Sequence, residues 1–215
     1  MDNLGVLSMK AIFFALLMVA ACSSQVRSVE PGIESMVPGA SAPKEPTVVL
    51  HADNDFTPPE RTDIALAAEL WGIQTSGLAK ITVIYDVDFA SEPNIKQHVE
   101  LSHNLVVRLQ SYLVPEEGLL GYVGPSGGIH NPYKVPLRMA FVTDRCEESS
   151  ARTGGLPQVA LHEVGHALGI PHQEFVGAVM YKYAVRHQAL CLKRADLAAF
   201  CVANDCKNHK MYPCE

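Results

Sequence analysis

Short runs of β-branched and aromatic residues, bounded by turn-forming residues, recur through the first two thirds of the chain. Such runs are typical of β-strands, because branched and aromatic side chains fit the pleated surface of a sheet. The clearest run is K-I-T-V-I-Y-D. Strands are predicted at Thr47–His51, Lys80–Asp86, Leu119–Val123 and Val135–Thr143.

Between the first two strands the apolar residues take the spacing of a helix. Thr57 stands three residues before Glu60, with two prolines between them, which is the pattern of a capped helix start. One face then carries Ile64, Ala67, Ala68 and Trp71, and the helix is predicted to end at Gly72. A second helix is predicted to begin at Pro157, because proline is favoured in the first turn.

The stretch Asn94–Leu113 fits two structures. Its apolar residues match a helical face, whereas Asn104–Leu109 alone also fits a strand. We favour the helix. Two histidines of this stretch, His98 and His103, are interpreted as surface residues rather than metal ligands.

The N-terminus is predicted to direct export. Lys10 precedes an apolar run, Ala11–Ala21, that is short for a permanent membrane span. The following V-A-A-C resembles a bacterial lipobox, which implies cleavage before Cys22 and lipidation of that cysteine, with a plain secretory signal as the alternative. Residues 1–21 are therefore predicted to be a signal peptide, 22–45 a flexible tether and 46–215 one folded domain, which the lipid would anchor in the bacterial envelope, with the outer membrane as the expected location.

Composition limits the possible partners. The formal charge of −6 and a sequence pI near 5.8 leave no basic field for nucleic acid, so DNA or RNA binding is not expected. Beyond Cys22 the chain has five cysteines, which in an exported protein predicts two disulfides and one odd thiol. The spacing leaves their connectivity open. They are Cys146, Cys191, Cys201, Cys206 and Cys214.

The most informative stretch is H-E-V-G-H-A-L-G-I-P-H at His162–His172. In a helix His162 and His166 share one face, and Gly169 can take the left-handed conformation that turns the chain so that His172 supplies a third nitrogen. Three protein ligands leave one zinc position open for water, as in catalytic rather than structural sites. Glu163 then suits the general base that activates this water for hydrolysis.

Met180 follows inside G-A-V-M-Y, and the motif with this Met-turn resembles the metzincin clan of metallopeptidases, matrixins in particular. The resemblance implies an α+β fold with a mixed twisted sheet, an N-terminal helix, an active-site helix, a Met-turn and a C-terminal helix near Leu192–Phe200. It implies that the three histidines bind one catalytic Zn²⁺, that Glu163 is base and acid, and that Met180 forms an apolar floor. The chain departs from matrixins in having Gln173 and Lys182 where they usually carry serine and proline.

Many matrixins hold a second zinc and calcium in a long loop. The corresponding segment here, Gly118–Gly128, is shorter, and His130 is its one candidate ligand, so we expect no second zinc there and leave calcium open. A peptide is expected to lie extended against an edge strand. Tyr181 and Tyr183 are placed in the wall of the side-chain pocket, with Tyr183 interpreted as a packed residue.

These observations predict a zinc endopeptidase acting on protein or peptide substrates. Two alternatives remain from the sequence: a zinc-binding envelope lipoprotein without catalysis, and a metallo-amidase acting on cell-wall peptides. Glu163 argues against the first, because zinc binding alone does not need that carboxylate.

Overall fold

The structure is a computed structural model, and it describes residues 47–114, 119–125, 137–148, 150, 154–183, 190–204, 206 and 210–214. The predicted signal peptide, Cys22, the tether up to residue 45 and His130 lie outside the described residues. The described elements, in chain order, are β1 (Thr47–Asp53), α2 (Pro58–Gln74), β2 (Lys80–Val87), α3 (Glu92–Glu100), β3 (Asn104–Leu109), η1 (Ser111–Leu113), β4 (Gly121–Pro125), β5 (Leu137–Val142), α4 (Thr143–Glu148), α6 (Gly155–Ala167) and α7 (Arg194–Asn204).

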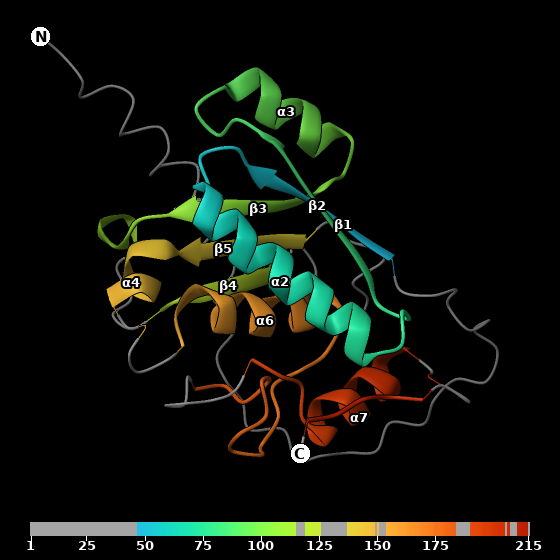
Figure 1. Ribbon diagram of the computed structural model, residues 1–215. Helices are drawn as coiled ribbons and strands as arrows, with labels where there is room; N and C mark the ends of the chain where they lie inside the picture. The colour runs from blue at the N-terminus through green and yellow to red at the C-terminus, as the bar shows by residue number, and fades with distance from the viewer. Residues whose placement is uncertain are drawn as a thin grey trace, which may run out of the picture. The chain divides into compact units, whose positions relative to one another are not determined.

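Five strands form one mixed sheet in the order β2-β1-β3-β5-β4 (Figure 1). The first four are parallel to one another, and β4 runs antiparallel at the edge beside β5. This mixed sheet with its helices is the α+β fold expected from the resemblance, which is confirmed. None of the helices among the described residues is both long and apolar enough to cross a bilayer.

The core lies between the sheet and the pair α2 and α6. Along β1, Val48, Leu50 and Ala52 are buried, while the residues between them face the other side of the sheet. Trp71 of α2 is completely buried, and its indole N–H donates to the carbonyl oxygen of Leu161 in α6 at 2.9 Å. Burial of a tryptophan with its N–H bonded fixes α2 against the helix that carries the histidine motif.

The helix favoured for Asn94–Leu113 is correct only in its first part. α3 ends at Glu100, and Asn104–Leu109 forms β3. Because β3 is a central parallel strand covered on both faces, it reads as a continuous apolar run without the alternation that identifies a strand. The surface interpretation of His98 is also wrong, because that side chain is buried.

The disulfides among the described residues join Cys191 to Cys214 and Cys201 to Cys206, and the thiol of Cys146 is buried and belongs to neither. Burial raises the pKa of this thiol to about 12, so it stays protonated at neutral pH. The first disulfide closes the C-terminal segment onto the end of α2. Gln74, the last residue of α2, also holds this segment: it accepts a hydrogen bond from the backbone N–H of Leu192 at 2.8 Å and donates one to the carbonyl oxygen of Tyr212 at 2.7 Å.

Candidate metal centre

Helix α6 carries two of the three predicted ligands on one face. The rings of His162 and His166, one turn apart, have centroids separated by 4.7 Å. The helix ends at Ala167, and Gly169 just beyond it has φ of +84° and donates its N–H to the carbonyl oxygen of His166, while Ile170 donates to that of Gly165. These two hydrogen bonds form a Schellman turn, which a glycine adopts without strain.

The turn brings the third histidine back to the helix. Nε2 of His172 lies 3.2 Å from Nε2 of His166, and one ring nitrogen from each of the three histidines lies within 4.8 Å of the others. Among the described residues, no fourth histidine, cysteine or carboxylate joins this cluster. A tetrahedral ion held by three imidazoles would keep one position for water or substrate.

Backbone carbonyls orient the two helical histidines. His162 donates from Nδ1 to the carbonyl oxygen of Val179 at 2.6 Å, and His166 donates from Nδ1 to that of Ile170 at 2.8 Å. Since a carbonyl can only accept, Nδ1 carries the proton and Nε2 is left with its lone pair for a metal. Burial lowers the pKa of His162 to about 4 and that of His166 to about 3, so both are neutral ligands at pH 7.

Glu163 lies on the same helix and is buried. Its Oε2 atom has no hydrogen-bond partner in the described part of the chain, although a buried polar atom normally has one. Burial raises the pKa of the Glu163 carboxyl to about 8, whereas a divalent cation on the neighbouring histidines acts in the opposite direction. The orphaned oxygen and the neutral imidazoles fit a zinc ion with an associated water, and imidazole ligands favour zinc among common divalent metals.

Two glycines allow close approach to this centre. A Cβ atom on Gly121, at the start of β4, would lie 2.8 Å from Oε1 of Glu163 and 2.7 Å from Val159. A Cβ atom on Gly165 would overlap the sulfur of Met180. Gly165 therefore lets the buried Met180 side chain pack directly against α6, and Gly121 lets the edge strand pass directly over Glu163.

Asp196 is a residue that the sequence analysis missed. It lies in the first turn of α7, is completely buried, and accepts backbone N–H groups of Val179, Met180 and Lys193 at 3.0, 2.9 and 2.8 Å. An acidic residue in the first turn of a helix is a sequence pattern that predicts a stabilised helix N-terminus. That its carboxylate also holds the Met-turn depends on tertiary packing, which no local pattern encodes.

The segment after the motif forms a closed loop. Gln173 donates its backbone N–H to the carbonyl oxygen of Met180 at 2.7 Å, and it bridges to Tyr181. The interpretation of Tyr183 as a packed residue is wrong, because it is 61% exposed, with the ammonium group of Lys182 4.8 Å from its ring centroid. Tyr181 packs edge-on against Tyr183, with ring centroids 5.8 Å apart.

The comparison with known proteins agrees with this geometry. The family model described as Matrixin matches residues 34–201. No individual curated protein sequence matches the chain. The matched range covers most of the chain and includes the helix, the three histidines and the Met-turn, so the chain belongs to the matrixin family of zinc metallopeptidases.

Proposed function

We propose that the chain is an endopeptidase that cleaves extended peptides at the His162, His166 and His172 centre. The observation that carries this proposal is the convergence of three neutral imidazoles beside a buried carboxylate whose Oε2 atom has no partner among the described residues. A purely structural zinc site would be closed by a fourth protein ligand and would not need that carboxylate.

The three histidines would hold the zinc ion, which supplies Lewis acidity when bound: it acidifies water and polarises a peptide carbonyl. Glu163 takes the proton of the attacking water at its carboxylate and delivers it to the leaving amine, which balances the hydrolysis. Val179 and Ile170 keep the imidazoles in one tautomer through their carbonyl groups. Because Glu163 is buried, bulk water does not compete with the attacking water for the carboxylate.

The substrate is proposed to pair with β4. This strand is the last one of the sheet in the described part of the chain; it pairs with β5 on one side and passes over α6 at Gly121. Backbone pairing along an edge strand binds a peptide with little dependence on its sequence. A bound strand would run past Glu163, which places a scissile bond beside the histidines.

The test compares Glu163→Gln with Glu174→Gln, an exposed carboxylate in the loop after His172. We expect Glu163→Gln to retain zinc and to lose roughly 10²–10⁴-fold in kcat on a quenched peptide library, as for loss of a general base. Glu174→Gln should cleave at the wild-type rate. Equal cleavage by all three proteins would refute the proposal, and zinc retention without cleavage in the wild type would favour a binding lipoprotein.

We also propose that the protein is anchored to the bacterial envelope through a lipid on Cys22. The support is the V-A-A-C sequence after the apolar run Ala11–Ala21. In cells expressing the full chain, radiolabelled palmitate should enter the wild type and not Cys22→Ser. A wild-type protein that remains unlabelled, or that is released into the medium, would point to an ordinary secretory signal.

A further inference from the structure

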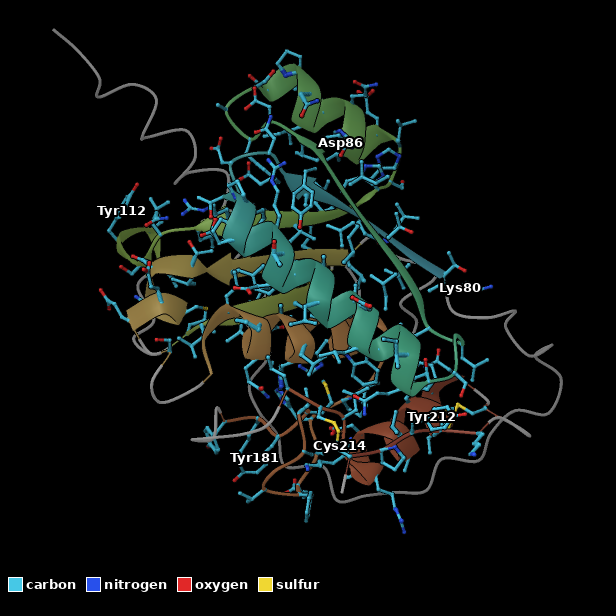
Figure 2. All side chains as sticks on the ribbon, in the orientation of Figure 1. Lys80, Asp86, Tyr112, Tyr181, Tyr212 and Cys214 are labelled. Carbon is cyan, nitrogen blue, oxygen red and sulfur yellow. A yellow bond between two sulfur atoms is a disulfide. The ribbon has the colours of Figure 1, made fainter. Side chains whose placement is uncertain are left out.

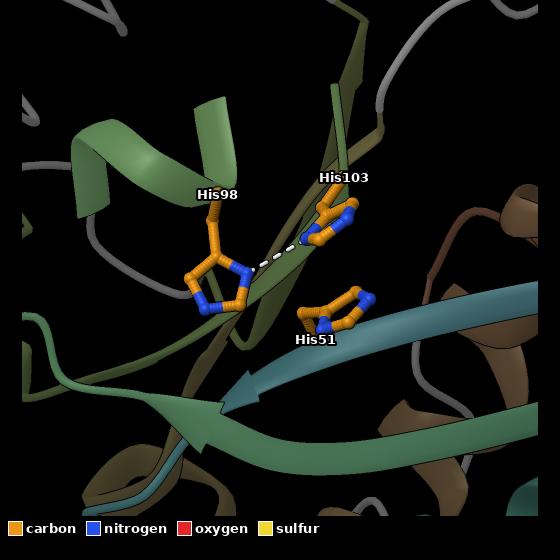
Figure 3. Close-up of side chains that lie close together, drawn as sticks. All are labelled: His51, His98 and His103. Atoms are coloured by element: carbon orange, nitrogen blue, oxygen red, sulfur yellow. Dashed lines mark hydrogen bonds between the residues drawn. The ribbon is translucent and has the colours of Figure 1, made fainter. Parts of the chain in front are cut away.

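A second group of three histidines lies in the domain, away from α6. One ring nitrogen from each of His51, His98 and His103 lies within 4.8 Å of the others, and the histidines of the active-site motif also lie within this limit (Figure 3). The three come from β1, from α3 and from the turn before β3. No short motif joins them, so the cluster exists only in the folded chain.

The alternation of β1 and β2 places this cluster on the face opposite the core. Leu50 and Ala52 point into the core, so His51 points to the other side. Along β2, Tyr85 packs against the core and Asp86 faces away from it. α3 lies beside β2, and Figure 2 labels Asp86 next to α3 and Tyr181, which follows Met180, at the opposite end of the view.

Asp86 holds His51 in one orientation. Nδ1 of His51 lies 3.0 Å from both carboxylate oxygens, and the strand register shifts by one residue at this point. Such a bulge re-aims a side chain. A histidine that donates from Nδ1 to a carboxylate presents Nε2 as a ligand of raised basicity, which is the usual arrangement around protein-bound zinc.

The other two histidines face each other directly. Nδ1 of His98 lies 2.8 Å from Nδ1 of His103, whereas the ring of His103 stacks on that of His51 with centroids 3.9 Å apart and planes 8° from parallel, so the His103 ring would turn on binding a shared ion. A tetrahedral zinc ion with Zn–N distances near 2.0–2.1 Å places its nitrogen ligands roughly 3.3 Å apart. The observed separations, from 2.8 Å to at most 4.8 Å, bracket that value.

A strained turn brings His98 and His103 together. His103 donates its N–H to the carbonyl oxygen of His98 at 3.0 Å, and Ser102 donates to that of Val99 at 2.9 Å, which forms a Schellman turn. Ser102 has φ of +56°, a region that non-glycine residues rarely adopt. Strained backbone of this kind concentrates at ligand sites, where surrounding contacts hold it in place.

The side chains that α3 buries and exposes differ from those of most surface helices. His98 is its one buried side chain, whereas Val99 and, just after the helix, Leu101 are 42% and 58% exposed. A helix normally docks by burying its apolar residues. α3 instead buries a histidine, while Ile95 is only partly buried, so an ion bound by the imidazoles would add to the attachment of this helix.

We propose that His51, His98 and His103 bind a divalent transition-metal ion, with zinc as the leading candidate, and that Asp86 positions His51 for it. The ion would join β1, α3 and the start of β3, so the site is structural and independent of hydrolysis. Its residues also differ from the segment Gly118–Gly128, which corresponds to the loop that holds a second zinc in many matrixins.

The first test counts metal in the purified protein after equilibration with zinc and removal of loosely bound ions. We expect about two zinc ions per chain in the wild type and in Glu100→Gln, an exposed control on α3. His103→Asn should hold about one and should still cleave peptide. Equal zinc content in wild type and His103→Asn would overturn the proposal.

The second test removes the other cluster, so that it remains decisive even if His103→Asn does not fold. The double variant His162→Asn/His166→Asn should keep about one zinc ion, and adding Asp86→Asn should weaken its binding roughly 10–100-fold. Zinc should also slow amide hydrogen exchange across α3 in this double variant. A double variant that binds no zinc, or whose α3 exchange is unchanged by zinc, would refute the site.

Discussion

Replacing Asp196 by asparagine tests how α7 controls the metal centre. Asp196 accepts the N–H of Val179, and the carbonyl oxygen of the same Val179 accepts Nδ1 of His162. The carboxylate is therefore linked to a metal ligand through a single peptide residue. Asparagine keeps the size of the side chain but replaces one acceptor oxygen by an amide that can only donate.

The cost follows from the three accepted hydrogen bonds. The asparagine oxygen can keep the bonds from Val179 and Lys193, but its NH₂ group then faces the buried N–H of Met180. Loss of one hydrogen bond to a charged acceptor costs about 1.5–3 kcal/mol, and the orphaned donor adds about 1–3 kcal/mol. We expect a destabilisation of roughly 2.5–6 kcal/mol, which lowers Tm by roughly 5–24 °C in a domain of this size.

The decisive measurement is zinc affinity, obtained by competition with a chromophoric chelator at a temperature where all proteins are folded. If Asp196 positions His162, Asp196→Asn should weaken zinc binding roughly 10–100-fold, as for other residues that orient a metal ligand. Glu69→Gln, an exposed carboxylate on α2, should change neither Tm nor affinity. A lower Tm with unchanged zinc affinity would show that Asp196 supports only the fold.

Three further results are expected. Gly121→Ala should lower kcat at least tenfold, because the added Cβ would displace the Glu163 carboxylate. Gly72→Ala should not, because the atom nearest to its added Cβ would be 3.4 Å away. An equal loss of kcat in both variants would refute this account. Ser102→Gly should raise the free energy of unfolding, measured by urea denaturation, by about 0.5–1 kcal/mol, because glycine adopts the left-handed backbone conformation of this position without strain. A decrease would contradict this prediction. Burial raises the pKa of Glu60, but hydrogen bonds from Arg108 and Thr57 outweigh this effect and hold that pKa below 4.5. Glu60→Gln should therefore lower the free energy of unfolding by its full amount at pH 7, and the difference from the wild type should disappear as the pH falls below 4.5. A difference that does not change with pH would contradict this prediction.

The first part of the active site could be predicted from the sequence because its geometry is local. Four-residue spacing on a helix, followed by a left-handed glycine, places His162, His166 and His172 together whatever surrounds them. The capped start of α2 was predictable for the same reason, since Glu60 accepts the N–H of Thr57 at 2.7 Å within one turn.

The remaining parts depend on elements that meet only in the folded domain. Asp196 reaches the Met-turn across the packing of α7, and Gly121 approaches Glu163 because an edge strand crosses α6. β3 was misread for a related reason: burial on both faces removes the alternation by which a strand is identified. Single-sequence patterns describe one element at a time, so contacts between elements stay hidden.

The active-site histidines are joined by a local motif and the histidines of the second cluster are not, but both clusters contain the same kind of turn. In both, a Schellman turn at the end of a helix brings a histidine beyond the turn back to one on the helix, with Gly169 or Ser102 in the left-handed position. At the active site the turn ends a helix buried in the core, so its geometry is held without a metal. α3 lacks such support because its buried side chain is His98 rather than an apolar residue. Elements with few buried apolar contacts open first in a native protein, so loss of metal from the second cluster should release α3 while the active site keeps its shape.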